Sequence, residues 1–453
     1  MININEITVS EISKSLRDRT ISVKELVQEY LQRIKDIDKG ENGLNSILEI
    51  NPDAIMIAEK LEGNQNQFNN VLFGVPVILK DSIDTADKMH TSAGSLALAN
   101  LITSSDADIV IRLREKGMVI LGKSNMTEFA NYMTKDMPPG YSSRGGQVLS
   151  PYIKDGCPSG SSTGSAVAVT SNLCSVSIGT DTGGSIISPS LNNSIVGFRP
   201  SMGAISQKGI IPISFTCDTA GPMTRTVEDA AILFSEITRN KVELEKKSDL
   251  KGLTVGVSES ELNSLSKEEG EKADSILHSL EKAGAVVKRI HIESISHESV
   301  KTIQKYEFKY TINKYLSNLP NEFPIKNLMD IIEFNHHNKK LALKFGQTKF
   351  IDAQDNTIGN LSEKDYINVL KEREIWKRQE MDVFEGIDYV IFFKEINISQ
   401  FIGLPSITIP YGLKKDGMPY GISLIGFTDV SLLQHAFHLE QLIGDRVIPK
   451  AYQ

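Results

Sequence analysis

The stretch that decides the fold is residues 157–200, which read CPSGSSTGSAVAVTSNLCSVSIGTDTGGSIISPSLNNSIVGFRP. Residues 159–165 are too small and hydroxyl-rich to pack as a core element, residues 166–172 are compatible with a helix, and residues 175–178 predict a short buried strand. The strand runs into a glycine-rich turn that ends at Ser185. Glycines tolerate a positive φ, and this conformation lets successive backbone N–H groups point toward one place and form a nest for an anion. A serine that closes such a nest has the layout of a nucleophile beside an oxyanion hole.

The usual base for such a serine, a histidine, is absent from the sequence between His90 and His278. The alternative base is Lys80, which ends the apolar run FGVPVILKD at residues 73–81. A low dielectric at this position would lower the pKa of the lysine and leave a neutral amine. Serine–lysine couples are a known variant of the serine–histidine arrangement.

Outside this core, helix and strand patterns alternate. Capping boxes at residues 8–11 and 22–25 predict two N-terminal helices, and apolar residues at helical spacing follow the second. Residues 267–282 predict a helix between strands at 252–257 and 285–292. This alternation predicts an α/β fold in which helices cover both faces of a sheet. Residues from about 300 to 385 are mostly helical in pattern, and we expect this elaboration to wall the site.

The sequence resembles the amidase signature family in its TDxGGS turn and its GVPVxxKD segment. The resemblance implies a Ser–Ser–Lys triad in which Lys80 is the base, Ser161 is the bridge, held in a cis peptide, and Ser185 is the nucleophile. The 24-residue separation of the two serines matches the family's spacing. The backbone N–H groups implied for the oxyanion hole are those of Thr182, Gly183, Gly184 and Ser185.

Further segments carry the same resemblance, namely residues 91–95, 121–129, 221–229 and 403–410. Residues 139–147, 306–309 and 313–316 are similar to the branch that contains bacterial peptide amidases. The resemblance implies a large, mixed, twisted central sheet in one amidase domain over residues 1–453. Its Ser/Gly-rich catalytic core is expected at about 70–230 and its helical elaboration at about 300–385.

The sequence indicates the residues of the substrate pocket less directly than those of the triad. We expect Met133, Gly160 and Arg144 on the substrate side, although Arg144 could equally have a structural hydrogen-bonding role. Ile187 stands where many members carry an arginine, so an ion pair from that position to Asp181 is lost, and Asp181 is expected to hold the nest. Residues 392–397 replace a loop that shapes the family's pocket.

Composition excludes several classes of function. The net charge of −8 argues against a general nucleic-acid binder. The N-terminus has no secretory pattern and no run reaches the roughly 18 apolar residues of a membrane helix, so we expect a cytoplasmic protein without membrane contact. The partner we expect is a small-molecule or peptide amide, and homodimer formation is left open.

Cysteine and histidine patterns indicate no cofactor and no metal. The three cysteines have no C-x-x-C spacing, and Cys157 is expected to be buried or half-buried rather than nucleophilic. The pairs His336–His337 and His435/His438 are expected on exposed helix surfaces, without a third ligand at motif spacing.

Three functions follow from these observations. The first is hydrolysis of linear carboxylic or peptide-type amides, other than peptide bonds, through an acyl-enzyme on Ser185. The second is an amidotransferase subunit that delivers ammonia to a partner. The third is a catalytically silent scaffold, which the altered 392–397 loop suggests and the intact triad disfavours.

Overall fold

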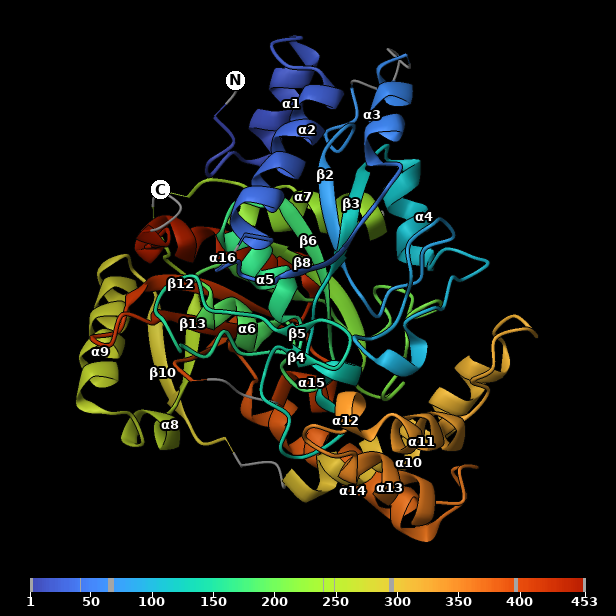
Figure 1. Cartoon of the computed structure of the whole chain (residues 1–453). Helices are drawn as coiled ribbons and strands as arrows, with labels where there is room; N and C mark the ends of the chain where they lie inside the picture. Colours follow the sequence, from blue (N-terminus) through green and yellow to red (C-terminus); the bar gives the residue numbers. More distant parts are fainter. Residues whose placement is uncertain are drawn as a thin grey trace.

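A mixed β-sheet runs through the molecule (Figure 1). The computed structural model describes residues 3–40, 42–63, 69–238, 240–247, 249–292, 297–394 and 398–450. Within them the eleven strands of the sheet, in spatial order, are β1 (Ile47–Ile50), β3 (Val119–Ser124), β2 (Pro76–Lys80), β6 (Val176–Asp181), β8 (Thr219–Thr224), β7 (Val196–Arg199), β12 (Ser406–Leu413), β13 (Pro419–Ile425), β11 (Tyr389–Phe392), β9 (Thr254–Ser258) and β10 (Val286–Ile290). A separate hairpin pairs β4 (Tyr141–Ser142) with β5 (Gly146–Gln147).

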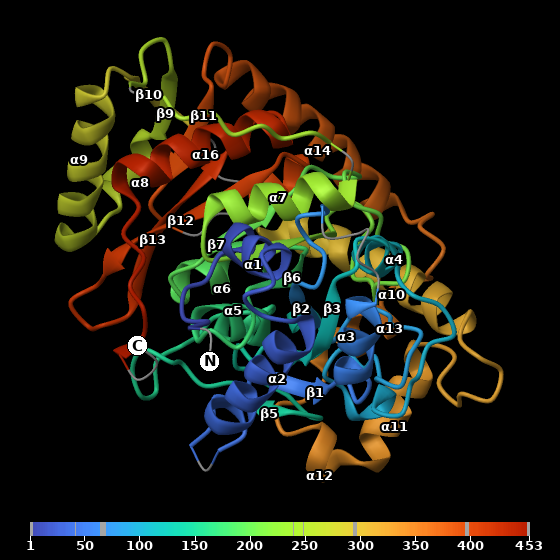
Figure 2. The same ribbon diagram turned by 90° about the horizontal axis from the view of Figure 1, so that it is seen from above.

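Helices cover both faces of the sheet, as predicted. In the described residues they are α1 (Val9–Arg17), α2 (Val23–Arg33), α3 (Ala54–Glu62), α4 (Asp108–Glu115), α5 (Thr163–Thr170), α6 (Ile187–Asn192), α7 (Val227–Thr238), α8 (Glu259–Asn263), α9 (Lys267–Lys282), α10 (His297–Ser317), α11 (Leu328–His337), α12 (Lys339–Ala342), α13 (Thr348–Asp355), α14 (Lys364–Val383), α15 (Ile398–Ile402) and α16 (Asp429–Ile443). Helices α5 and α6 pack on one face and α7 and α16 on the other (Figure 2).

The strands that position the site lie side by side. β2 pairs in parallel with β3 and with β6, and its register sets Leu79 against Ile178. All five residues of β2 are buried, which explains the uninterrupted apolar run before Lys80. β6 continues beyond the predicted end at residue 178 to Asp181. Parallel pairing therefore brings Lys80 to the sheet edge at which β6 enters the glycine-rich turn.

Helix α5 follows the serine-rich loop and is buried along its whole length. Its small side chains let it approach neighbouring backbone closely. A Cβ on Gly164 would lie 2.2 Å from the Ser46 carbonyl oxygen and 2.3 Å from that of Asn125. This contact fixes the position of the loop that precedes α5.

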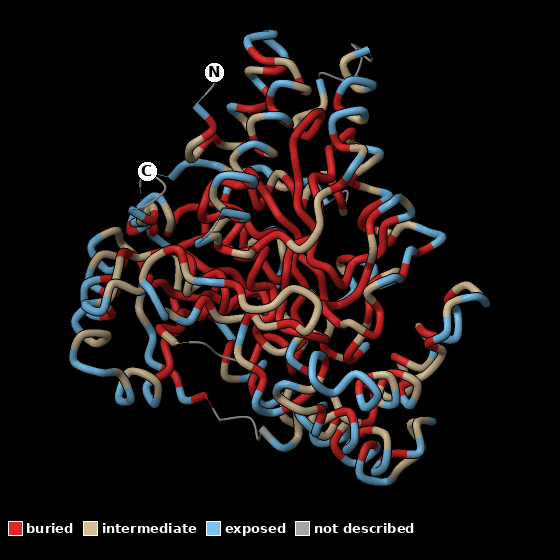
Figure 3. The backbone as a smooth tube through the Cα atoms, in the orientation of Figure 1, coloured by how far each residue is buried: buried red, intermediate tan, exposed pale blue. Residues whose placement is uncertain are grey.

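The predicted helical elaboration corresponds to α10–α14. Its helices α10, α11 and α13 share an apolar cluster with residues of segments 93–101, 126–137 and 211–213, Phe129 among them. The Phe129 and Phe350 rings lie 5.0 Å apart, and Phe350 stacks on Phe308 at 5.3 Å. Burial is most continuous in the central sheet, whereas α10–α14 alternate buried and exposed turns (Figure 3).

Most local predictions are confirmed. Thr8 and Ser22 both form capping boxes, and α9 has the predicted bounds. The prediction for Cys157 is wrong: the residue is exposed, because it lies in an irregular surface segment in which the neighbouring Pro158 is the buried residue. The prediction for His438 is also wrong, since the residue is only 5% exposed and its ring contacts the Glu245 carbonyl oxygen.

We expect Gly164→Ala to destabilise the protein by about 3 kcal/mol or more, because the new Cβ overlaps two carbonyl oxygens that belong to rigid backbone. The matched control is Gly270→Ala in α9, whose Cβ would meet nothing within 4 Å and should stabilise by about 0.5–1 kcal/mol. Urea unfolding followed by circular dichroism measures both. Equal midpoints for the two variants would contradict the packing described for α5.

Candidate active site

Lys80 is fully buried at the end of β2, and its ammonium group has three oxygen neighbours. Its Nζ lies 2.8 Å from Ser161 Oγ, 2.9 Å from Ser162 Oγ and 3.1 Å from the Thr180 carbonyl oxygen. The structure thus brings together two of the three predicted triad residues, Lys80 and Ser161. Sequence reasoning missed Ser162, although it is the direct neighbour of Ser161 and accepts an equivalent hydrogen bond.

Burial lowers the pKa of Lys80 to about 7, and the nearby charges of Asp181 and Asp218 only partly oppose the effect of burial. A lysine with a pKa near neutrality has a substantial fraction of free amine at physiological pH. Lys80 can therefore accept a proton from a hydroxyl group that contacts it.

Ser161 is held by the backbone on both sides. The peptide bond between Gly160 and Ser161 is cis. The Thr127 amide donates to the Ser161 carbonyl at 3.1 Å, and the Ser162 amide donates to the Ser185 carbonyl at 3.2 Å. This last bond ties the predicted bridging segment to the predicted nucleophile through the main chain. The Ser185 hydroxyl makes no hydrogen bond with a described residue, and Ser185 as a whole is 9% exposed.

Asp181 organises the glycine-rich turn. Its carboxylate accepts from the Gly184 amide at 2.9 Å and from the Ile186 amide at 2.7 Å. The Gly184 amide therefore points to Asp181 and not to the site, which departs from the predicted four-amide oxyanion hole. In the described part of the chain, the amides of Gly183 and Ser185 have no protein acceptor.

Asp181 keeps an arginine partner even though position 187 is isoleucine. Arg199 Nε lies 3.4 Å from the Asp181 carboxylate, and both side chains are fully buried. The guanidinium also donates to the Cys217 carbonyl at 2.8 Å. The sequence analysis missed this pair because Arg199 comes from β7, which β8 separates from β6.

A second carboxylate, that of the half-buried Asp218, also contacts the turn. It accepts from the Thr182 hydroxyl at 2.7 Å and from the amides of Ile213 and Ser214 at 2.8 and 2.9 Å. Burial raises its pKa to about 6. Asp218 thereby fixes the side chain of Thr182, the residue that directly follows β6.

Ser185 opens into a hollow of about 310 Å³. The lining residues are Thr127, Ala130, Asn131, Tyr132, Pro139, Ser159, Gly160, Thr182, Gly183, Ser185, Ser188, Ile213, Gln304 and Lys349. Gly160 is thus where the sequence analysis expected it. Gln304 of α10 and Lys349 of α13 show that the helical elaboration walls the site.

Two predicted substrate-side residues lie elsewhere. Arg144 does not line the hollow, because Glu49 at 2.5 Å and Asp81 at 3.5 Å hold its guanidinium. This is the structural role left open for it. Met133 is fully buried in the apolar cluster that the core segments share with α10, α11 and α13. Of the altered loop, residues 395–397 lie outside the described residues, while the amides of Phe393 and Lys394 donate to Glu261.

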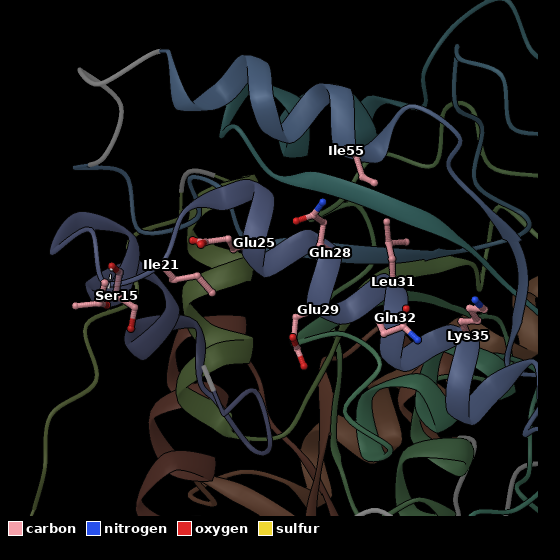
Figure 4. Close-up of a pocket in the computed structure, with 10 residues that line it drawn as sticks. Ser15, Ile21, Glu25, Gln28, Glu29, Leu31, Gln32, Lys35 and Ile55 are labelled. Atoms are coloured by element: carbon pink, nitrogen blue, oxygen red, sulfur yellow. Dashed lines mark hydrogen bonds between the residues drawn. The ribbon is translucent and has the colours of Figure 1, made fainter. Parts of the chain in front are cut away.

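A larger surface hollow of about 940 Å³ lies over α2 (Figure 4). Side chains of α2, among them Gln28 and Gln32, line it together with Ile55 of α3. None of the predicted triad residues is among its lining, so this surface has no part in the chemistry of Ser185.

The histidine pairs do not gather further ligands. Across the described ranges, no group of three or more His, Cys, Asp or Glu side chains is arranged to hold a metal ion. His438 Nε2 instead lies 2.7 Å from the Glu245 carbonyl oxygen. The described helices also include none with the length and apolar character to span a bilayer.

Comparison with known proteins identifies the family. The profile of the Amidase family matches residues 25–393. The chain belongs to the amidase family. A probable amidase of Arabidopsis thaliana is 34% identical to it, with 99% of this chain and 92% of that one covered. As an amidase, the chain is an amide hydrolase.

Solved amidase structures superpose on the whole chain. The native peptide amidase of Stenotrophomonas maltophilia has a TM-score of 0.89 and 32% identity, with 98% of each chain covered. An amidase family protein of Bacillus anthracis has a TM-score of 0.90 and 34% identity over 99% of this chain and 93% of that one. Among the relatives of other function, a glutamyl-tRNA(Gln) amidotransferase subunit from Pseudomonas syringae is 29% identical over 97% of this chain and 98% of that one.

We expect Asp181→Asn to destabilise the amidase by about 3–5 kcal/mol, because the change leaves the buried Arg199 charge without its partner. The asparagine side chain also has an NH2 group in place of one carboxylate oxygen, so it cannot accept both hydrogen bonds from the Gly184 and Ile186 amides in the same way. The control is Asp155→Asn at an exposed turn with positive φ, which asparagine tolerates and which should shift stability by less than about 0.5 kcal/mol. Denaturant unfolding of both variants checks this, and an unchanged midpoint in Asp181→Asn would refute the anchoring role.

Proposed function

We propose that this amidase cleaves linear carboxylic amides, including peptide-type amides, by a relay through Ser185, Ser161 and Lys80. The observation that carries the proposal is the contact of 2.8 Å between Lys80 Nζ and Ser161 Oγ in a fully buried setting. A neutral amine in that position needs no histidine to activate a serine.

The relay moves two protons in the same direction, from Ser185 toward Lys80. The neutral Lys80 amine takes the Ser161 proton while Ser161 takes the proton of Ser185, whose side chain must rotate toward Ser161. Ser185 Oγ forms a bond to the amide carbon, and the carbonyl oxygen becomes an oxyanion. The amides of Gly183 and Ser185, which have no other acceptor in the described residues, support that charge.

Collapse of the tetrahedral intermediate breaks the C–N bond. The proton on Lys80 returns through Ser161 to the departing nitrogen, which leaves as ammonia or an amine. Water then gives a proton to the same relay, and its oxygen forms a bond to the acyl carbon. The bond between that carbon and Ser185 Oγ breaks, the relay returns the proton to Ser185, and the carboxylic acid is released.

The substrate class is proposed from the site and from the relatives together. The hollow of about 310 Å³ accepts a small acyl group or the end of a peptide. The likeness to a peptide amidase over nearly the whole chain supports C-terminal peptide amides as a substrate class. We therefore propose amino acid and short peptide amides as the first compounds to assay.

The alternative function, delivery of ammonia as part of an amidotransferase, rests on relatives of that name, such as the one from Pseudomonas syringae. The higher identity to the amidases of Arabidopsis thaliana and Bacillus anthracis favours the hydrolase. Isolation of the chain in a stable complex with a second, different protein would favour the amidotransferase. The scaffold alternative is disfavoured by the intact contact between Lys80 and Ser161.

We expect Ser185→Ala to lower kcat on N-acetyl amino acid amides by at least about 10⁴-fold, because no acyl-enzyme can form. The control is Ser206→Ala, at an exposed serine outside the lining of the hollow, which should keep activity within about twofold. Ammonia release measures both variants. Substantial turnover by correctly folded Ser185→Ala would disprove the assignment of the nucleophile.

A further inference from the structure

Lys349 is the only charged side chain among the described residues that line the hollow at Ser185. No carboxylate lines that hollow in the described chain. The other lining side chains are apolar, hydroxyl or amide groups, so they do not neutralise a cation. The site that is proposed to bind an amide is therefore electropositive on one wall.

The position of Lys349 is set by the packing of α13. The amides of Lys349 and Phe350 donate to the Met133 carbonyl at 3.2 and 3.4 Å. The Phe350 ring is fully buried and contacts rings from both the core and α10. Lys349 Nζ then donates to the Asn131 carbonyl at 2.7 Å and lies 5.6 Å from the centre of the Tyr132 ring.

Among the described residues, no acidic side chain forms an ion pair with Lys349. Burial and the like charges of Lys301 and Lys135 lower its pKa to about 8, so the group is mostly protonated at pH 7. Asp352, one turn further along α13, lies 3.9 Å from Lys305.

We propose that Lys349 selects amides whose acyl part carries a carboxylate. An ammonium group has three N–H donors, and the Asn131 carbonyl takes one of them, which leaves two for an anionic group in the hollow. A charge-assisted hydrogen bond of this kind is roughly twice as strong as one between neutral groups. This inference rests on the proposed amide hydrolysis and narrows its substrate class to acidic amides.

Binding to the Ser185→Ala protein tests the inference without turnover. The probes are the α-amides of N-acetyl-aspartate and N-acetyl-glutamate, each paired with its neutral asparagine or glutamine counterpart. We expect the better acidic amide to bind at least about tenfold more tightly than its neutral partner in isothermal titration calorimetry at pH 7. Adding Lys349→Met should abolish that preference, whereas Lys349→Arg should retain most of it.

The matched control is Lys340→Met, which removes an exposed lysine of the same helical elaboration and should leave the preference unchanged. Equal binding of acidic and neutral amides to Ser185→Ala would overturn the inference. So would equal loss of affinity for both kinds of amide on Lys349→Met, since that result indicates a packing role only.

Turnover by the wild-type protein separates this inference from the proposed function. Hydrolysis of acidic and neutral amides at equal kcat/KM overturns the role of Lys349 and leaves the amide hydrolase standing. Acid-selective binding that depends on Lys349, with no amide hydrolysed by the wild type, supports the inference and counts against the proposed hydrolysis of these compounds.

Discussion

Removal of the Lys80 amine from water is the constraint on which the site depends. Burial disfavours the charged ammonium form of the lysine relative to the neutral amine, so the pKa of Lys80 drops to about 7. A carboxylate hydrogen-bonded to Lys80 would cancel that effect. The structure instead surrounds the amine with hydroxyl and carbonyl oxygens. The nearby Asp181 carboxylate pairs with Arg199 and accepts hydrogen bonds from two amides of the turn.

The neighbouring strand provides a contrast. Lys123 on β3 is also fully buried, and its pKa is lowered by burial, but Asp81 and Asp84 are among the charges that oppose the shift. Its ammonium donates to the Ile83 carbonyl and to the Thr91 hydroxyl, away from the serine-rich loop. Two buried lysines on adjacent strands thus have different surroundings, and of the two only Lys80 contacts the serine-rich loop, through Ser161 and Ser162.

The sequence predicts the parts of the site that are local along the chain. The apolar run before Lys80, the small residues of α5 and the glycine turn before Ser185 each specify their own backbone, and the structure places them as expected. Arg199 could not be assigned to Asp181, because the pair depends on strand order. The role of Arg144 could not be predicted either, because its partner Glu49 is 95 residues away along the chain and no local pattern indicates the pair. Lys349 and Gln304 reach the hollow from the elaboration, whose docking depends on long-range contacts such as that of Phe129 with Phe350.

The most direct test of this account is the rate at which a fluorophosphonate labels Ser185 as a function of pH, followed by intact mass. Lys80 is a base only when neutral, so labelling should be present above pH 7 and should fall about tenfold per pH unit as pH drops well below that value. We predict a single adduct on the wild type, none on Ser185→Ala, and slow labelling without the step near pH 7 on Lys80→Met. A wild-type rate that is independent of pH from about 5.5 to 8.5, or that Lys80→Met reproduces, would contradict the role of the buried lysine.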